Sequence, residues 1–114
     1  MNIGIIGCGN ISDTYFESQK IFKNINIIAC SDIIKELSDK KAKQHKVKSC
    51  NVDDLLCNKD IDIILNLTIP SAHKEIIIKS IKNGKHCFSE KPLAINFKDG
   101  LKIKKISNEN NLLV

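Results

Sequence analysis

The feature that most constrains this chain is a glycine turn that directly follows a short apolar run near the N-terminus. The run covers residues 3–6, and residues 7–12 read Gly-Cys-Gly-Asn-Ile-Ser. We expect a buried strand, a tight turn and a helix that begins near Ile11 and packs on a sheet. The residues that fall at helical spacing on this packing face are Ile11, Tyr15, Ser18 and Phe22.

Two further Ile-rich runs, at residues 25–30 and 61–67, are separated from the first run and from each other by polar segments long enough for helices. Strands that are covered on both faces have almost continuous apolar sequences, and all three runs have this character. Alternating strand and helix segments are typical of a parallel sheet. The sequence therefore predicts an α/β fold, a doubly wound parallel sheet of the Rossmann type with helices on both faces.

The segment after Pro70 has clear helix signals. Ser71 is the predicted N-cap, and Gly84 stands where a helix-ending residue with left-handed backbone is needed. We expect Ile77, Ile78 and Ile81 to form the buried side of this helix.

Weaker patterns complete the prediction, among them a short helix that Asn51 or Asp53 would cap. The remaining predicted elements are helices at 34–45, 52–57 and 97–108, strands at 47–50 and 86–89, and the start of a new strand at 111–114. No repeat or linker divides the chain, so residues 1–114 are predicted to form one domain. Because the sequence stops as a strand begins, we expect a domain truncated at its C-terminal end.

Composition argues against several classes of protein. The formal charge is +5, but all 18 basic residues are Lys, and only 4% of residues are aromatic, which argues against nucleic-acid binding. No apolar run approaches the roughly 18 residues of a membrane span. The N-terminus has no signal-peptide pattern, so we expect a cytoplasmic protein without a membrane segment.

The cysteines and histidines do not have the spacing of metal ligands, so no metal site is predicted. We expect the five cysteines to be reduced and structural. Cys8 leaves two interpretations open, because a thiol at a helix N-terminus can be reactive, whereas a cysteine in a turn can serve as a small residue. The residues concerned are Cys8, Cys30, Cys50, Cys57, Cys87, His45, His73 and His86.

The glycine turn indicates a dinucleotide-binding site. A pyrophosphate requires backbone N–H groups at close approach and the positive end of a helix dipole, and both need small residues in the turn. Gly7 and Gly9 meet this need, and Ser12 takes the place of the third small residue of the pattern. The predicted pyrophosphate-binding residues are Gly7, Cys8, Gly9, Asn10 and Ile11.

An acidic residue follows the second predicted strand at the position that favours NAD. Asp32 lies twenty positions after Ser12, where a carboxylate accepts hydrogen bonds from the adenosine ribose. Its negative charge would repel the 2′-phosphate of NADP. NAD is therefore favoured, while Lys35 leaves NADP possible.

Three motifs together resemble the glucose-fructose oxidoreductase, inositol dehydrogenase and rhizopine catabolism protein family. They are the glycine turn, the sequence Thr-Ile-Pro-Ser-Ala-His at residues 68–73, and Gly-Lys-His-Cys-Phe-Ser-Glu-Lys-Pro-Leu-Ala at residues 84–94. Their order and spacing match as well, and the resemblance covers essentially the whole chain. It implies an N-terminal domain that binds NAD or NADP.

The resemblance also implies roles for individual residues. Lys91 would stand near the nicotinamide and the substrate as the catalytic lysine, and Glu90 and Pro92 would hold its loop, with Pro92 following a cis peptide bond. The loop of the second motif would pass along the ribose and nicotinamide, with His73 as a wall residue. The cofactor-binding residues implied in these two loops are Thr68, Ile69, Pro70, His73, Glu90, Lys91 and Pro92.

In this family a second domain carries the substrate pocket, and these 114 residues do not contain it. The resemblance therefore implies the cofactor half of an oxidoreductase that acts on a sugar, a cyclic polyol or a nucleotide sugar, without turnover by itself. Sheet surface that the second domain would cover leads us to expect weak stability or self-association. The alternative hypothesis is a stand-alone NAD-binding or redox-sensing module that acts through a protein partner.

Overall fold

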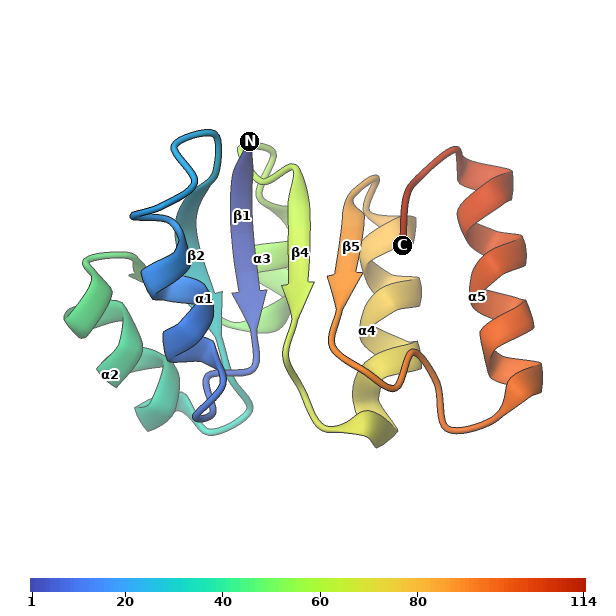
Figure 1. Ribbon diagram of the computed structural model, residues 1–114, viewed down its shortest axis with the longest axis horizontal. Coiled ribbons are helices and arrows are strands. Elements are labelled where there is room, and N and C mark those ends of the chain that lie inside the picture. Colours follow the sequence, from blue (N-terminus) through green and yellow to red (C-terminus); the bar gives the residue numbers. More distant parts are fainter.

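A computed structural model describes the whole chain, residues 1–114, as five parallel strands and five helices (Figure 1). The strands lie side by side in the order β3-β2-β1-β4-β5. This order confirms the predicted doubly wound parallel sheet, because the chain crosses outward from β1 in both directions. The elements are β1 (Asn2–Ile6), α1 (Ser12–Ser18), β2 (Asn26–Ser31), α2 (Lys35–His45), β3 (Lys48–Ser49), α3 (Val52–Cys57), β4 (Ile63–Asn66), α4 (Pro70–Lys82), β5 (His86–Ser89) and α5 (Phe97–Asn110).

Two hydrophobic cores cover the two faces of the sheet. Phe16 of α1 and Ala42 of α2 pack in a core of nine buried residues on one face. Leu55 of α3 and Ile77 of α4 belong to a core of eleven buried residues on the other face. Neighbouring residues of one strand enter different cores, as Ile64 and Leu65 of β4 do, because successive side chains point to opposite faces.

Gly4 in the middle of β1 lets α3 approach the sheet closely. A Cβ atom built at Gly4 would lie 2.7 Å from Cδ2 of Leu55 and 2.9 Å from Cδ1 of Ile61. Any larger residue at this strand position would therefore displace the side chains that fill the core beneath it.

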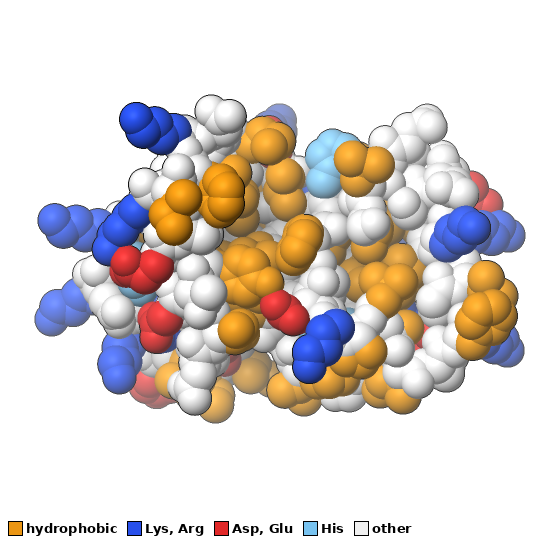
Figure 2. Space-filling view, viewed as in Figure 1, with side chains coloured by type: hydrophobic (Ala, Val, Ile, Leu, Met, Phe, Trp, Pro, Cys, Tyr) orange, Lys and Arg blue, Asp and Glu red, His pale blue; other side chains and the backbone are white.

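The face of the sheet that carries α1 and α2 is only partly covered. In Figure 1 no helix lies in front of β4 and β5, and in Figure 2 hydrophobic side chains gather at the surface in the middle of the same view. Phe88 of β5 is 58% exposed, and only the edge of the Tyr15 ring meets it, at a centroid distance of 6.5 Å. None of the helices combines the length and apolar character that crossing a membrane requires.

The predicted packing face of α1 was right for Tyr15, which packs against the core on this side of the sheet, and wrong for Ile11 and Phe22. The helix ends at Ser18, Phe22 lies beyond it and is exposed, and Ile11 precedes it and is exposed as well. Phe16, which the predicted stripe left out, is fully buried. Phe16 is therefore the aromatic side chain that α1 buries in the core, and a stripe that runs to Phe22 extends beyond the end of this short helix.

The predicted start of α4 was also wrong, because Pro70 is its first residue and Ser71 does not cap it. Proline suits the first helical position, where a backbone N–H would have no partner. Ile77 and Ile81 are buried as expected, but Ile76 takes the place predicted for Ile78, which is only half-buried.

Two predicted helix ends are confirmed, the N-cap of α3 and the glycine after α4. Asn51 accepts a hydrogen bond from the N–H of Asp54 at 2.7 Å at the start of α3, and Gly84 has a φ of +72° after α4.

The predicted strand at the C-terminus is not formed as a regular strand, but the segment does lie along β5. Leu113 accepts a backbone hydrogen bond from the N–H of Cys87 at 2.9 Å and donates its own N–H to Nδ1 of His86 at 3.0 Å. His86 therefore fixes the end of the chain against the edge of the sheet. Two bonds are too few for a regular ladder.

Lys85 is a buried lysine that joins two segments at the amino ends of β4 and β5. The glycine turn lies at the opposite end of the sheet, after the carboxyl end of β1. The side chain of Lys85 reaches below the surface and donates hydrogen bonds to the carbonyl oxygens of Asn58, at 2.7 Å, and Ile61, at 2.8 Å. Burial lowers the pKa of Lys85, because the ammonium group gives up most of its hydration. The two carbonyls replace that hydration and tie the connection between α3 and β4 to the start of β5.

Replacing Lys85 by Met should lower the free energy of unfolding by about 1–3 kcal/mol, because the buried carbonyl of Ile61 would lose its donor and the part-buried carbonyl of Asn58 would keep only the N–H of Ile61. Urea unfolding followed by circular dichroism would measure the change. The matched control is Lys82→Met at an exposed position of α4, which should stay within about 0.5 kcal/mol of the parent. Equal stability of the two variants would contradict a structural role for Lys85.

Candidate functional site

A cleft of about 600 Å³ opens where β1, β2 and β4 reach their carboxyl ends. The connection after β1 leads to β2 and the connection after β4 leads to β5, so the chain leaves this point in opposite directions, and open α/β sheets bind their ligands at such a point. Five predicted site residues line the cleft, namely Gly7, Gly9, Asp32, Thr68 and Ile69. The structure thus brings together residues from the glycine turn, from the end of the second strand and from the loop at residues 68–73.

Gly7 makes the sharp turn that forms the floor of the cleft. Its φ is +102°, and a Cβ atom at this position would lie 2.5 Å from the carbonyl carbon and oxygen of Leu67. Both observations require glycine. Gly9 differs, because a Cβ built on it would meet nothing within 4 Å. Gly9 therefore borders open space, and a ligand can approach its backbone closely.

The turn between β1 and α1 presents unbonded backbone donors. The N–H groups of Gly9, Asn10 and Ile11 find no acceptor within the chain, and Gly9 and Asn10 lie at the surface. Ser12 is fully buried and donates its hydroxyl to the carbonyl of Gly9 at 2.6 Å, which fixes the turn. Free amides around an open glycine suit the oxygens of a phosphate group.

Asp32 is bound to the backbone on both sides of the cleft mouth. Its Oδ2 accepts the N–H of Cys8 at 2.6 Å, and its Oδ1 accepts the N–H of Ile34 at 2.8 Å. A carboxylate has about four acceptor positions, so about two stay available for further donors. The sequence predicted the place of this carboxylate but gave no signal for its bond to the glycine turn.

Lys35 is the basic residue that could attract the 2′-phosphate of NADP, and in the structure it forms an ion pair with Asp39. Its ammonium group binds both carboxylate oxygens of Asp39 one helical turn later, at 2.7 and 2.6 Å. Lys35 also does not line the cleft.

Cys8 is a buried small residue of the turn and not a reactive thiol. It is 1% exposed, and its thiol lies 3.4 Å from the carbonyl oxygen of Ser31. The neighbouring thiol of Cys30 and burial raise the pKa of Cys8, which disfavours the thiolate that reacts with oxidants. Of the two interpretations of Cys8, the structural one holds.

The side walls of the cleft are mostly apolar and were not predicted from the sequence. Ile33 is 98% exposed, although isoleucine is normally buried, and it stands beside Asp32 at the cleft mouth. An isoleucine pair directly after the acidic residue was the available signal. The other apolar residues that line the cleft are Ile6, Ile34, Leu37, Val52, Leu67, Ile69, Ala72 and Ile76.

His73 does not line the cleft but lies beneath it. The residue is 1% exposed. Its Nε2 lies 2.9 Å from the carbonyl oxygen of Thr68, and its Nδ1 lies 2.6 Å from the carbonyl oxygen of Pro92. The ring therefore joins the loop after β4 to the loop after β5. Pro70 lies between Thr68 and His73 in the sequence, is the first residue of α4 and is exposed.

The loop after β5 carries the predicted catalytic lysine. Lys91 is exposed, its side chain makes no hydrogen bond, and the peptide bond to Pro92 is cis, as expected. The carboxylate of Glu90 accepts a hydrogen bond from the hydroxyl of Tyr15 in α1. That bond lowers the pKa of Glu90, and the Lys91 N–H contributes to the same effect. Burial, followed by the bond to Glu90, raises the pKa of Tyr15 to about 12.

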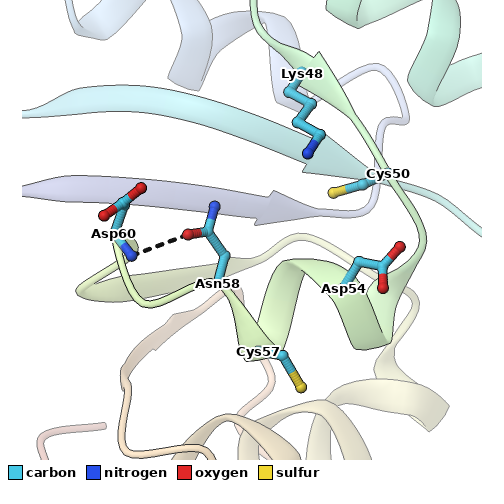
Figure 3. Close-up of a pocket in the computed structure, with 6 residues that line it drawn as sticks. All are labelled: Lys48, Cys50, Asp54, Cys57, Asn58 and Asp60. Atoms are coloured by element: carbon cyan, nitrogen blue, oxygen red, sulfur yellow. Dashed lines mark hydrogen bonds between the residues drawn. The ribbon is translucent and has the colours of Figure 1, made fainter.

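A second hollow, of about 440 Å³, lies beside β3 and α3 and away from the glycine turn (Figure 3). Its polar groups bond little to one another, since the one bond among the labelled residues joins the N–H of Asp60 to Oδ1 of Asn58 at 2.9 Å. Cys50, Asp54 and Cys57 line it without forming a cluster that could hold a metal ion, and no such cluster exists elsewhere in the chain. The predicted cofactor residues Gly7, Gly9 and Asp32 line the first cleft and not this hollow.

Comparison with known proteins identifies the family of this chain. A family model described as an oxidoreductase family with an NAD-binding Rossmann fold matches residues 1–114. The inositol 2-dehydrogenase/D-chiro-inositol 3-dehydrogenase of Lactiplantibacillus plantarum is 30% identical over an alignment of 114 residues in length. The alignment covers 96% of this chain and 32% of that protein. The myo-inositol 2-dehydrogenase of Thermotoga maritima is 30% identical over 103 residues, which cover 87% of this chain and 30% of that protein.

Among solved structures, the WlbA dehydrogenase of Chromobacterium violaceum, in complex with NADH and UDP-GlcNAcA, superposes with a TM-score of 0.92 at 23% identity. The match covers 98% of this chain and 33% of that one. The chain thus spans about a third of the length of the proteins it matches. It belongs to the glucose-fructose oxidoreductase, inositol dehydrogenase and rhizopine catabolism protein family, as the NAD-binding Rossmann domain of that family.

Proposed function

We propose that this chain binds NAD in the cleft at the carboxyl ends of β1, β2 and β4, as the cofactor-binding part of an oxidoreductase. The whole enzyme would transfer a hydride between the nicotinamide and a hydroxyl or carbonyl group of a sugar, a cyclic polyol or a nucleotide sugar. The family match over residues 1–114 carries the proposal. The inositol dehydrogenases among the relatives support the substrate class.

The cleft has the donors and acceptors that a dinucleotide needs. The free N–H groups of Gly9, Asn10 and Ile11 would bind the pyrophosphate, and the open space beside Gly9 leaves room for it. The remaining acceptor positions of Asp32 would bind the ribose hydroxyls. The apolar wall that begins at Ile33 would cover the flat face of the adenine.

The charges at the cleft mouth favour NAD over NADP. A 2′-phosphate on the adenosine ribose would lie against the carboxylate of Asp32, and like charges at contact distance repel. Lys35 cannot offset this repulsion while both oxygens of Asp39 bind it. We therefore propose NAD as the cofactor of this chain.

Lys91 is the residue we assign to the reacting end. Bound NAD supplies the hydride acceptor, and an ammonium group beside it would hydrogen-bond the substrate oxygen and stabilise the negative charge that develops there. The exposed side chain of Lys91 has no competing partner within the chain. Glu90, which Tyr15 holds, would fix the direction in which the loop leaves β5.

Titration of the chain with NADH, followed by nucleotide fluorescence, should show saturable binding below about 1 mM. Gly9→Ala should weaken binding at least about tenfold, because its methyl group would enter the space of the pyrophosphate without touching the protein. Gly100→Ala, at a site in α5 that is equally open, is the matched control and should bind like the parent. A parent chain that binds neither NADH nor NADPH would contradict the proposed function.

Replacing Asp32 by Ser should shift the ratio of NADPH to NADH affinity toward NADPH by about tenfold, because it removes one negative charge from beside the 2′-position. The same titration with both cofactors measures the ratio. Asp60→Ser removes an equal charge at the second hollow and should leave the ratio unchanged. A ratio that moves equally in both variants would assign the effect to net charge and not to the site.

The phenol of Tyr15 gives an optical signal from the loop, because the chain has one tyrosine and no tryptophan. Phenolate absorbance should titrate with a pKa of about 12 in the parent and lower in Glu90→Gln, which removes the negative charge but keeps the burial. Since folding raises this pKa from 10, the corresponding stability is complete below about pH 10 and is lost as the pH rises through about 12. An unchanged pKa in Glu90→Gln would contradict the Tyr15–Glu90 contact.

A further inference from the structure

A polar residue at the end of β4 stands out in an apolar strand. Asn66 is fully buried between Leu65 and Leu67, which are both buried as well. An amide without partners would be costly in such surroundings. Its position therefore calls for a specific set of hydrogen bonds.

Asn66 uses both ends of its amide on three different segments. Its Oδ1 accepts the hydroxyl of Thr68 at 2.7 Å, in the loop after β4. Its Nδ2 donates to the hydroxyl of Ser89 at the end of β5, at 3.2 Å, and to the carbonyl oxygen of His73 in α4, at 3.3 Å. The backbone carbonyl of Asn66 also accepts the N–H of Glu90 at 3.0 Å.

These bonds continue through His73 to the loop of the catalytic lysine. The His73 ring lies between the carbonyl oxygens of Thr68 and Pro92, and Pro92 directly follows Lys91. A continuous set of buried polar contacts thus joins Thr68, which lines the cleft, to the segment that carries Lys91. We call the set formed by Asn66, Thr68, His73 and Ser89 the Asn66 bridge.

We propose that Asn66 is a positioning residue, which through the Asn66 bridge holds the cleft wall at Thr68 and the Lys91 loop in one fixed arrangement. This inference rests on the proposed function, because it concerns the nicotinamide end of the same site. A leucine would fill the volume of Asn66 but make none of the bonds, and an aspartate would lack the donor for the carbonyl oxygen of His73. An amide both donates to this carbonyl and accepts from the hydroxyl of Thr68.

The position of the bridge predicts a selective effect on binding. Asp32 and the glycine turn hold the adenosine and pyrophosphate at the β1 and β2 side of the cleft, whereas the bridge lies at β4 and β5. Disturbing Asn66 should therefore weaken interactions with the nicotinamide and spare those with ADP-ribose, which lacks that ring.

The test compares the affinities of NADH and ADP-ribose in the parent, Asn66→Leu and Lys85→Met chains. We expect Asn66→Leu to weaken NADH at least about fivefold, the equivalent of about one hydrogen bond, and ADP-ribose less than about twofold. The emission of bound NADH should also change in this variant. Lys85→Met, which loses buried hydrogen bonds at the opposite end of the sheet, should leave both affinities unchanged.

Thr68→Val tests the same proposal with a substitution outside strand β4. It removes the hydroxyl that Asn66 binds, so its effect on NADH should not add to that of Asn66→Leu in the double variant. Additive effects, or equal losses for NADH and ADP-ribose, would overturn the positioning role while leaving the proposed function intact. A parent chain that distinguishes the two ligands neither by affinity nor by NADH emission would overturn the role as well. Failure of the parent to bind either ligand would instead overturn the proposed function.

Discussion

The contact between the backbone of Gly7 and the backbone of Leu67 is the constraint on which the site depends. The absence of a Cβ lets the end of β1 lie against the end of β4, and the N–H of Gly7 meanwhile bonds the carbonyl of Ser31 at 2.9 Å. The carboxyl ends of three neighbouring strands are thereby joined at one residue. The glycine turn, the Asp32 carboxylate and the Thr68 loop all leave the sheet from this junction, so their spacing follows from it.

Most of the fold could be predicted because its signals are local and repeated. Ile-rich runs buried on both faces predict parallel strands, and Gly84 and Asn51 mark helix ends by their own backbone and side-chain preferences. The failures are equally instructive. The buried face of α1 depends on how a short helix meets the sheet, which the sequence does not show, whereas Pro70 by itself favours the first position of a helix and was the available signal for the start of α4.

The site residues follow the same division. Gly7, Gly9 and Asp32 were predicted because each performs a task that few residue types can perform at that position. Asn66, Tyr15 and the apolar wall after Asp32 were missed, since their roles arise from contacts with other segments of the chain, as in the bond between Tyr15 and Glu90. The Gly-Lys-His motif shows a further limit, because Lys85 and His86 bind backbone at the edge of the sheet and at the chain end, away from the cleft.

The bond from Asp32 to the N–H of Cys8 has a consequence for the entropy of ligand binding. A glycine-rich turn is flexible by itself, and ordering it during binding would oppose association through lost conformational entropy. Asp32, Ser12 and the Ser31 carbonyl restrain the turn from three sides before any ligand arrives. The free amides are thus preorganised, so we expect little conformational entropy to be lost in the turn when a ligand binds.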